Sequence, residues 1–181
     1  MPRLNLITEK DQIPEDKRHI FEAIASSRGQ VGGPFAVLLN SPEVAGRAAH
    51  LGSYIRFESI LSDVDRELAI ITTSREFDCD YEWSAHVRLA KQVGVRDEAI
   101  SVVANHGPLT ALTDDEALII QFGRELFQNH RVCDETFVAA KAKFGDQGLT
   151  ELTATMGYYG MLACALNVFQ IEPPPNIQGL P

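Results

Sequence analysis

The chain has 181 residues, a length at which one domain can bury a sufficient hydrophobic core. Its formal net charge of −9 and the lack of a basic block disfavour nucleic acids and anionic membrane surfaces as partners. It has no apolar run long enough to span a membrane, no secretory signal, and an odd number of cysteines. We therefore expect a cytoplasmic protein with reduced thiols.

Helical periodicity runs along most of the chain, and strand signals are nearly absent. After an extended arm at 1–14, helices are predicted over 15–29, 41–59, 61–77, 80–94, 95–107, 113–130, 134–145 and 149–171, with a short helical piece at 34–40. The last segment is almost entirely apolar, which indicates either a central core helix or part of a subunit interface. A Pro-rich tail at 172–181 follows. The sequence thus predicts one all-α domain over 1–181, a bundle of about eight helices.

The stretch CDYEWSAH, from Cys79 to His86, combines three reactive side chains. Cys79, Glu82 and His86 occupy positions i, i+3 and i+7, which place a thiol, a carboxylate and an imidazole on one helical face. Asp78 is expected to cap this helix, with Cys79 in its first turn. Free N–H groups there lower a thiol pKa, whereas neighbouring acidic residues raise it, so the net direction stays open.

Glu67 lies on the preceding helix, beside the apolar face of that helix. The two helices are expected to be antiparallel neighbours, so Glu67 could face Cys79 or His86 across the pair. The alternative is an ion pair with Arg66, Arg75 or another surface cation.

Ordinary structural roles compete with a catalytic one at each of these positions. Cys79 could be a small buried residue, although Cys133 and Cys164 fit a core role better. Glu82 and His86 could form a solvated pair one helical turn apart. Cys, Glu and His are zinc ligands, but this spacing is not a recognised zinc pattern, so we expect neither metal nor cofactor.

Three runs of sequence resemble the carboxymuconolactone decarboxylase-like family, which includes alkylhydroperoxidase D (AhpD). They are RELAIITTSREFDCDYEWSAHVRLAKQVG, TDDEALIIQFGRELFQNHRV and TELTATMGYYGMLACALNVFQIEPPP. The similarity covers most of the chain, roughly residues 30 to 173. The resemblance implies an AhpD-like helical fold built on a two-helix hairpin. It also implies a homotrimer or homohexamer, with the active site near subunit contacts.

In the peroxidase branch of that family, a glutamate, a CxxC pair and a downstream histidine form a proton relay. By resemblance, Glu67 matches the glutamate, Cys79 the first cysteine and His86 the histidine. Glu82 stands at the place of the second cysteine, and Tyr81 at the place of a relay histidine. A dithiol cycle needs two thiols, so it cannot close within this motif.

Three functions follow as hypotheses. The first is a cofactor-free decarboxylase or isomerase in which Glu67, Glu82 and His86 move protons on a small carboxylated or lactone substrate, while Cys79 lines the pocket or assists. The second is a thiol-dependent, peroxiredoxin-like peroxidase that uses Cys79 as its single reactive cysteine. The third is a non-catalytic, oligomeric binding protein that retains the fold.

Overall fold

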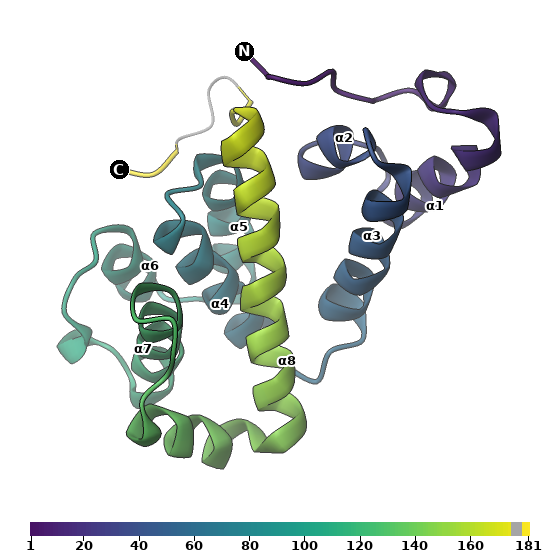
Figure 1. Cartoon of the computed structure of the whole chain (residues 1–181). Coiled ribbons are helices and arrows are strands. Elements are labelled where there is room, and N and C mark those ends of the chain that lie inside the picture. Colours follow the sequence, from purple (N-terminus) through teal and green to yellow (C-terminus); the bar gives the residue numbers. More distant parts are fainter. Residues whose placement is uncertain (175–178) are drawn as a thin grey trace. The chain divides into compact units, whose positions relative to one another are not determined.

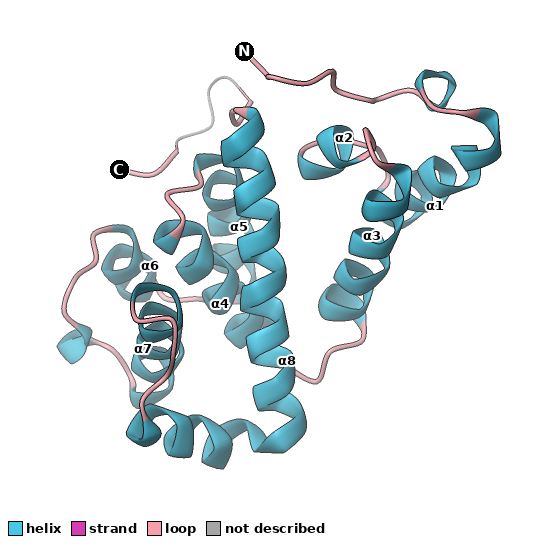
Figure 2. Cartoon of the chain, viewed as in Figure 1, coloured by secondary structure: helices cyan, strands magenta, loops and turns pink. Residues whose placement is uncertain are grey.

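The computed structural model describes residues 1–174 and 179–181. Over these residues it contains helices and no strand, so the predicted all-α class is confirmed (Figures 1 and 2). The eight α-helices are α1 (Arg18–Arg28), α2 (Pro34–Leu38), α3 (Pro42–Phe57), α4 (Asp63–Glu76), α5 (Asp80–Val93), α6 (Asp97–Ala104), α7 (Asp114–Gln128) and α8 (Asp134–Phe169). Residues 175–178 of the predicted tail lie outside the described part of the chain.

Short 3-10 helices alter the predicted boundaries in three places. The predicted arm at 1–14 contains one at Lys10–Gln12, and the first predicted helix begins as another at Glu15–Lys17 before α1 starts. A third, Leu109–Ala111, precedes α7.

The last two predicted helices correspond to the two helical stretches of α8, which are separated by non-helical backbone at Gly145. Gly145 has φ 65° and ψ −177°, a conformation that glycine adopts without the steric cost of a Cβ atom. The predicted helix stop at this glycine is therefore confirmed, and a second helical stretch follows it as predicted.

The chain divides into two compact units. The first comprises residues 1–59 and 164–172, and the second comprises 60–163 with the described residues of 173–181. In the first unit, α3 packs against α1 and α2. The apolar side chains buried there include Ile24, Phe35, Val37, Ala45 and Ile55.

The second unit is built around α4, which packs against α5, α6 and α7. Every residue from 67 to 74 on α4 is buried, which is typical of a helix enclosed on all sides. The buried hydroxyls of Thr72, Thr73 and Ser74 donate to carbonyl oxygens four residues earlier, at 2.7–2.9 Å. A β-branched and polar run can therefore occupy a core helix without unsatisfied hydroxyl groups.

Helix α8 contributes to the same core through Leu149, Leu152 and Met156. Its length and apolar composition would be sufficient to cross a membrane, but half of its apolar stretch is buried inside the protein. The core helix of a folded domain can be equally long and apolar. The buried contacts of α8 bear out the predicted core role, and its predicted part in a subunit interface stays a prediction.

Gly123 on α7 is a point of close helix contact that can be tested by substitution. A Cβ atom there would lie 2.7 Å from Cγ2 of Thr72 and 3.2 Å from Cε of Met156. We expect Gly123→Ala to lower the free energy of unfolding by about 1–3 kcal/mol through overpacking, measured by urea denaturation.

Gly157 provides the matched control for this substitution. It is exposed on α8, and a Cβ atom there would meet nothing within 4 Å. Gly157→Ala should therefore be neutral or stabilise by up to about 1 kcal/mol, because alanine is the better helix former. Equal effects of the two substitutions would contradict the close contact at Gly123.

Candidate active site

Glu67 and His86 meet inside the second unit, across the pair formed by α4 and α5. Oε2 of Glu67 lies 2.8 Å from Nδ1 of His86. The cations considered as alternative partners are engaged elsewhere: Arg66 pairs with Asp63, and Arg75 pairs with Asp78. Of the partners predicted for Glu67, the structure therefore selects the histidine.

Glu82 lies on the other side of the same imidazole. Its Oε2 is 3.4 Å from Nε2 of His86, one helical turn away on α5. Glu67, Glu82 and His86 are 6%, 4% and 7% exposed, so the predicted alternative of a solvated Glu82–His86 pair is wrong. The imidazole is held between two buried carboxylates, one on each helix.

Cys79 is the N-cap residue of α5, and the predicted cap at Asp78 is wrong. Cys79 has extended backbone angles, and its carbonyl accepts the first helical hydrogen bond from the N–H of Trp83 at 3.0 Å. Asp78 has φ 46° and pairs with Arg75. The backbone of Asp78 is in the left-handed region, so α5 begins one residue later than predicted.

The thiol of Cys79 is fully buried, in contrast to Cys133 and Cys164, which are exposed. The expectation that the latter two fit a core role better is wrong. Burial raises the pKa of Cys79 to about 11, and the charge of Glu82 adds to this. The backbone N–H groups of Glu82 and Tyr81 act in the opposite direction but do not outweigh burial. The thiol is therefore protonated at neutral pH.

Two tyrosines of α8 extend the site beyond the predicted residues. The ring of Tyr159 packs edge-on against the imidazole of His86, with centroids 4.9 Å apart and planes at 82°. Tyr158 packs in turn against Tyr159 at 5.3 Å. The sequence carries no signal for this contact, because Tyr159 is far from His86 along the chain and lies in a uniformly apolar segment.

Over residues 1–174 and 179–181, no group of three or more His, Cys, Asp or Glu side chains is arranged to hold a metal ion. The chemistry that these side chains can perform themselves is proton transfer, because carboxylates and an imidazole lie within hydrogen-bonding reach of one another. The expectation that no metal or cofactor takes part stays a prediction.

A family model matches part of the chain. Residues 42–120 match the model of the Carboxymuconolactone decarboxylase family. The resemblance to this family that the sequence predicts is confirmed over this segment. The match begins at the first residue of α3, ends within α7 and includes Glu67, Cys79, Glu82 and His86. A comparison with curated protein sequences finds no match.

Solved structures with the same fold include AhpD-like proteins. A peroxidase-related protein with an alkylhydroperoxidase AhpD core, from Ralstonia eutropha JMP134, has a TM-score of 0.75 at 18% identity, covering 94% of this chain and 92% of its own. The apo debrominase Bmp8 has a TM-score of 0.70 at 15% identity, with coverages of 96% and 93%. A Bmp8 variant with a cysteine replaced by alanine, in complex with 2,3,4-tribromopyrrole, has a TM-score of 0.72 at 14% identity, with coverages of 97% and 94%. The predicted AhpD-like fold is confirmed.

The raised pKa of Cys79 predicts a loss of stability in alkaline solution. Between pH 9 and pH 11 the thiol of the unfolded chain releases a proton that the folded chain retains, so the free energy of unfolding falls. The contribution of this thiol to the free energy of unfolding is fully present below pH 9 and is lost as the pH rises to about 11. The loss amounts to about 3 kcal/mol, since each pKa unit corresponds to about 1.4 kcal/mol.

Urea denaturation below pH 9 and near pH 11 measures this effect. Cys79→Ala should remove about 3 kcal/mol of the alkaline loss. Cys133→Ala is the control, because that thiol is exposed, and it should leave the loss unchanged. An alkaline loss of the same size in wild type and Cys79→Ala would show that the buried thiol does not titrate in this way.

Proposed function

We propose that this protein is a cofactor-free enzyme that transfers protons on a small carboxylated or lactone substrate, by decarboxylation or isomerisation. The observation that carries the proposal is the position of His86, with Glu67 at 2.8 Å from Nδ1 and Glu82 at 3.4 Å from Nε2. The match of residues 42–120 to the carboxymuconolactone decarboxylase family model supports the proposal that the protein is an enzyme.

The energetic cost of the site supports a functional role. Burying ionisable groups is costly, and well-packed apolar residues of similar volume often give equal or greater stability. Three titratable side chains on α4 and α5 are nevertheless each less than a tenth exposed, and both carboxylates contact the imidazole of His86. Buried titratable clusters of this kind are concentrated at catalytic sites.

The geometry suggests a separate task for each group. Oε2 of Glu67 lies 2.8 Å from Nδ1 of His86. In the proposed tautomer Nδ1 carries the proton and donates it in a hydrogen bond to Glu67, which orients the ring. Nε2 of His86 and the carboxylate of Glu82 then exchange a proton with the substrate. Decarboxylation leaves an electron pair on carbon that must take up a proton, and isomerisation removes a proton from one carbon and returns it to another. Both reactions need only such a donor and acceptor.

Cys79 has a supporting role in this proposal. A thiol with a pKa of about 11 is protonated at neutral pH, and the thiolate is the nucleophilic form. The side chain therefore contributes shape and polarity to the interior near Glu82, and the reaction does not require its oxidation.

Replacing the histidine tests the proposal most simply. The wild type is assayed against a panel of small lactone carboxylates and keto acids, with carbon dioxide release and ultraviolet absorbance as the two readouts. For any substrate found, His86→Ala should lower kcat/KM by about 10²- to 10⁴-fold, the usual contribution of general acid–base catalysis. Cys79→Ser should keep most of the activity.

His50→Ala is a suitable control, because His50 is exposed on α3 and belongs to neither helix of the site. It should leave kcat/KM unchanged. Equal losses in His86→Ala and Cys79→Ser would contradict the proposal and favour chemistry at sulfur.

A single-cysteine peroxidase is the second candidate, and one observation favours it. The backbone N–H groups of Tyr81 and Glu82, at the start of α5, lower the pKa of the Cys79 thiol and would stabilise its thiolate. Proteins of the same fold include a peroxidase-related protein and a debrominase crystallised as a cysteine variant. In this reaction peroxide would oxidise the thiolate to a sulfenic acid, and an external thiol would reduce it again.

Peroxide consumption in the presence of excess dithiothreitol separates the two candidates. If the proton-transfer proposal holds, wild type and Cys79→Ser consume hydrogen peroxide at the same rate, because the buried thiol stays protonated. Cys133→Ser controls for the exposed thiol. A rate that depends on Cys79 and not on Cys133 would establish the peroxidase instead.

A further inference from the structure

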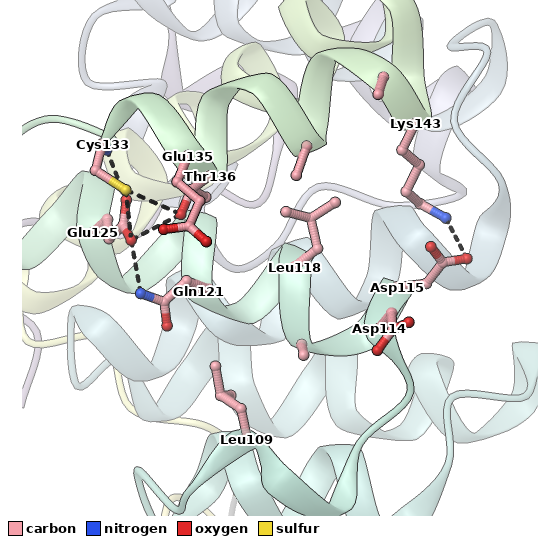
Figure 3. A pocket seen from close by; sticks show the side chains of 13 residues that line it. Leu109, Asp114, Asp115, Leu118, Gln121, Glu125, Cys133, Glu135, Thr136 and Lys143 are labelled. Carbon is pink, nitrogen blue, oxygen red and sulfur yellow. Dashed lines mark hydrogen bonds and ion pairs between the residues drawn. The ribbon is translucent and has the colours of Figure 1, made fainter.

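A pocket of about 640 Å³ lies between α7 and the part of α8 before Gly145, within the second unit (Figure 3). Its volume is in the range of small-molecule binding sites. None of Glu67, Cys79, Glu82 and His86 lines it, so it is distinct from the candidate active site.

The middle of the pocket is apolar, and its two ends are polar. Leu118 projects into the middle, with Leu109 below it in the view of Figure 3. Ala117, Ala139 and Ala142 complete the apolar lining. Such a surface suits the hydrocarbon part of a ligand.

Glu125 occupies one end of the pocket and is only 8% exposed. Its Oε1 accepts hydrogen bonds from Nε2 of Gln121 at 2.7 Å and from Oγ1 of Thr136 at 2.9 Å. Sγ of Cys133 lies 3.5 Å from the same oxygen. Oε2 accepts from the backbone N–H of Cys133 at 2.8 Å. A carboxylate oxygen has two lone pairs, so Oε2 has capacity for one further donor.

The carboxylate of Glu125 is charged but has no cationic partner. Burial raises its pKa, but the donors from Cys133, Gln121 and Thr136 outweigh burial, so the pKa lies below its ordinary value. In the described part of the chain these donors are all neutral, and no Lys, Arg or His forms an ion pair with Glu125. The start of α8 offers only the partial charge of a helix dipole. These donors stabilise the charge without neutralising it, so a bound cation could form a charge-assisted hydrogen bond to this carboxylate.

The pocket as a whole is negatively charged, like Glu125 itself. Asp114, Asp115, Glu125 and Glu135 line it together with one cation, Lys143. The ammonium group of Lys143 is 2.7 Å from Asp115, at the end opposite Glu125 in Figure 3. Four carboxylates against one ammonium group attract cations and disfavour anionic ligands.

We propose that this pocket binds an organic cation with an aliphatic body, specifically an alkylammonium ion. The ammonium group donates to Oε2 of Glu125, and the alkyl chain lies over Leu118 and Ala139. Leu118 and Glu125 are seven residues apart on α7, about 10 Å at 1.5 Å per residue, which accommodates a chain of about six carbons. The proposal does not depend on the function assigned to His86.

Isothermal titration calorimetry of the full chain tests it with hexylammonium, hexanol and hexanoate as probes. These three ligands share the alkyl chain and differ in the charge of the head group. Wild type should bind hexylammonium at least about 10-fold more tightly than hexanol, because a charge-assisted hydrogen bond to a carboxylate is the stronger one. Hexanoate should bind more weakly than either.

Two substitutions locate the site. Glu125→Gln keeps the shape of the side chain and removes its charge, so it should reduce the preference for hexylammonium over hexanol by about 10-fold. Ala139→Trp replaces an exposed lining residue and should weaken both ligands by filling the apolar middle. Asp146→Asn is the control, because it removes one exposed carboxylate of α8 outside this pocket and should leave the preference unchanged.

Circular dichroism shows whether each variant is folded. Equal binding of hexylammonium and hexanol by wild type, or no binding at millimolar concentration, overturns the proposal. The proposal also fails if Glu125→Gln keeps the preference, or if Asp146→Asn reduces it equally. If Glu125→Gln is unfolded, unchanged hexylammonium binding by Ala139→Trp overturns the proposal.

Discussion

The hydrogen bond between Glu67 and His86 is the constraint on which the rest of the site depends. It joins α4 to α5 in the interior of the second unit, where neither side chain has more than a tenth of its surface exposed. Helix α4 is enclosed by its neighbours, so Glu67 has little freedom to turn away. The imidazole is held by Glu67 at Nδ1 and by a T-shaped contact with the ring of Tyr159, and its Nε2 lies 3.4 Å from Glu82.

Local spacing predicted the part of the site that lies on a single helix. Glu82 and His86 are one turn apart, so helical geometry alone brings them together. The contact of Glu67 with His86 depends on how two helices pair, and spacing could only narrow the possible partners. The contact of Tyr159 was beyond prediction, because it depends on how α8 packs against α5 and no pattern in the sequence specifies that.

Backbone conformation accounts for the wrong prediction of the helix cap before α5. Asp78 is a good N-cap residue by type, but its positive φ turns the chain there, and the cap passes to Cys79. At Gly145, by contrast, the residue type correctly indicated the break between the last two helical stretches, because glycine adopts a positive φ without steric cost. Assembly into trimers or hexamers and a cytoplasmic location stay predictions.

Two buried carboxylates of the second unit illustrate how a charge can be held in a core. Glu67 faces an imidazole that can carry a proton, so proton movement is possible at that site. Glu125 faces only neutral donors, so its charge is fixed and is suited to binding instead. The same residue type therefore supports catalysis in one place and recognition in the other, according to its partners.

Nitrogen-15 NMR of the His86 side chain tests the role of this hydrogen bond most directly, because it reports which ring nitrogen carries a proton. We predict a protonated Nδ1 in the wild type, donating to Glu67, and loss of this preference in Glu67→Leu, which removes the acceptor. A wild-type imidazole that is protonated on Nε2 alone, with a bare Nδ1, would contradict this role, since Nδ1 could then donate nothing to Glu67.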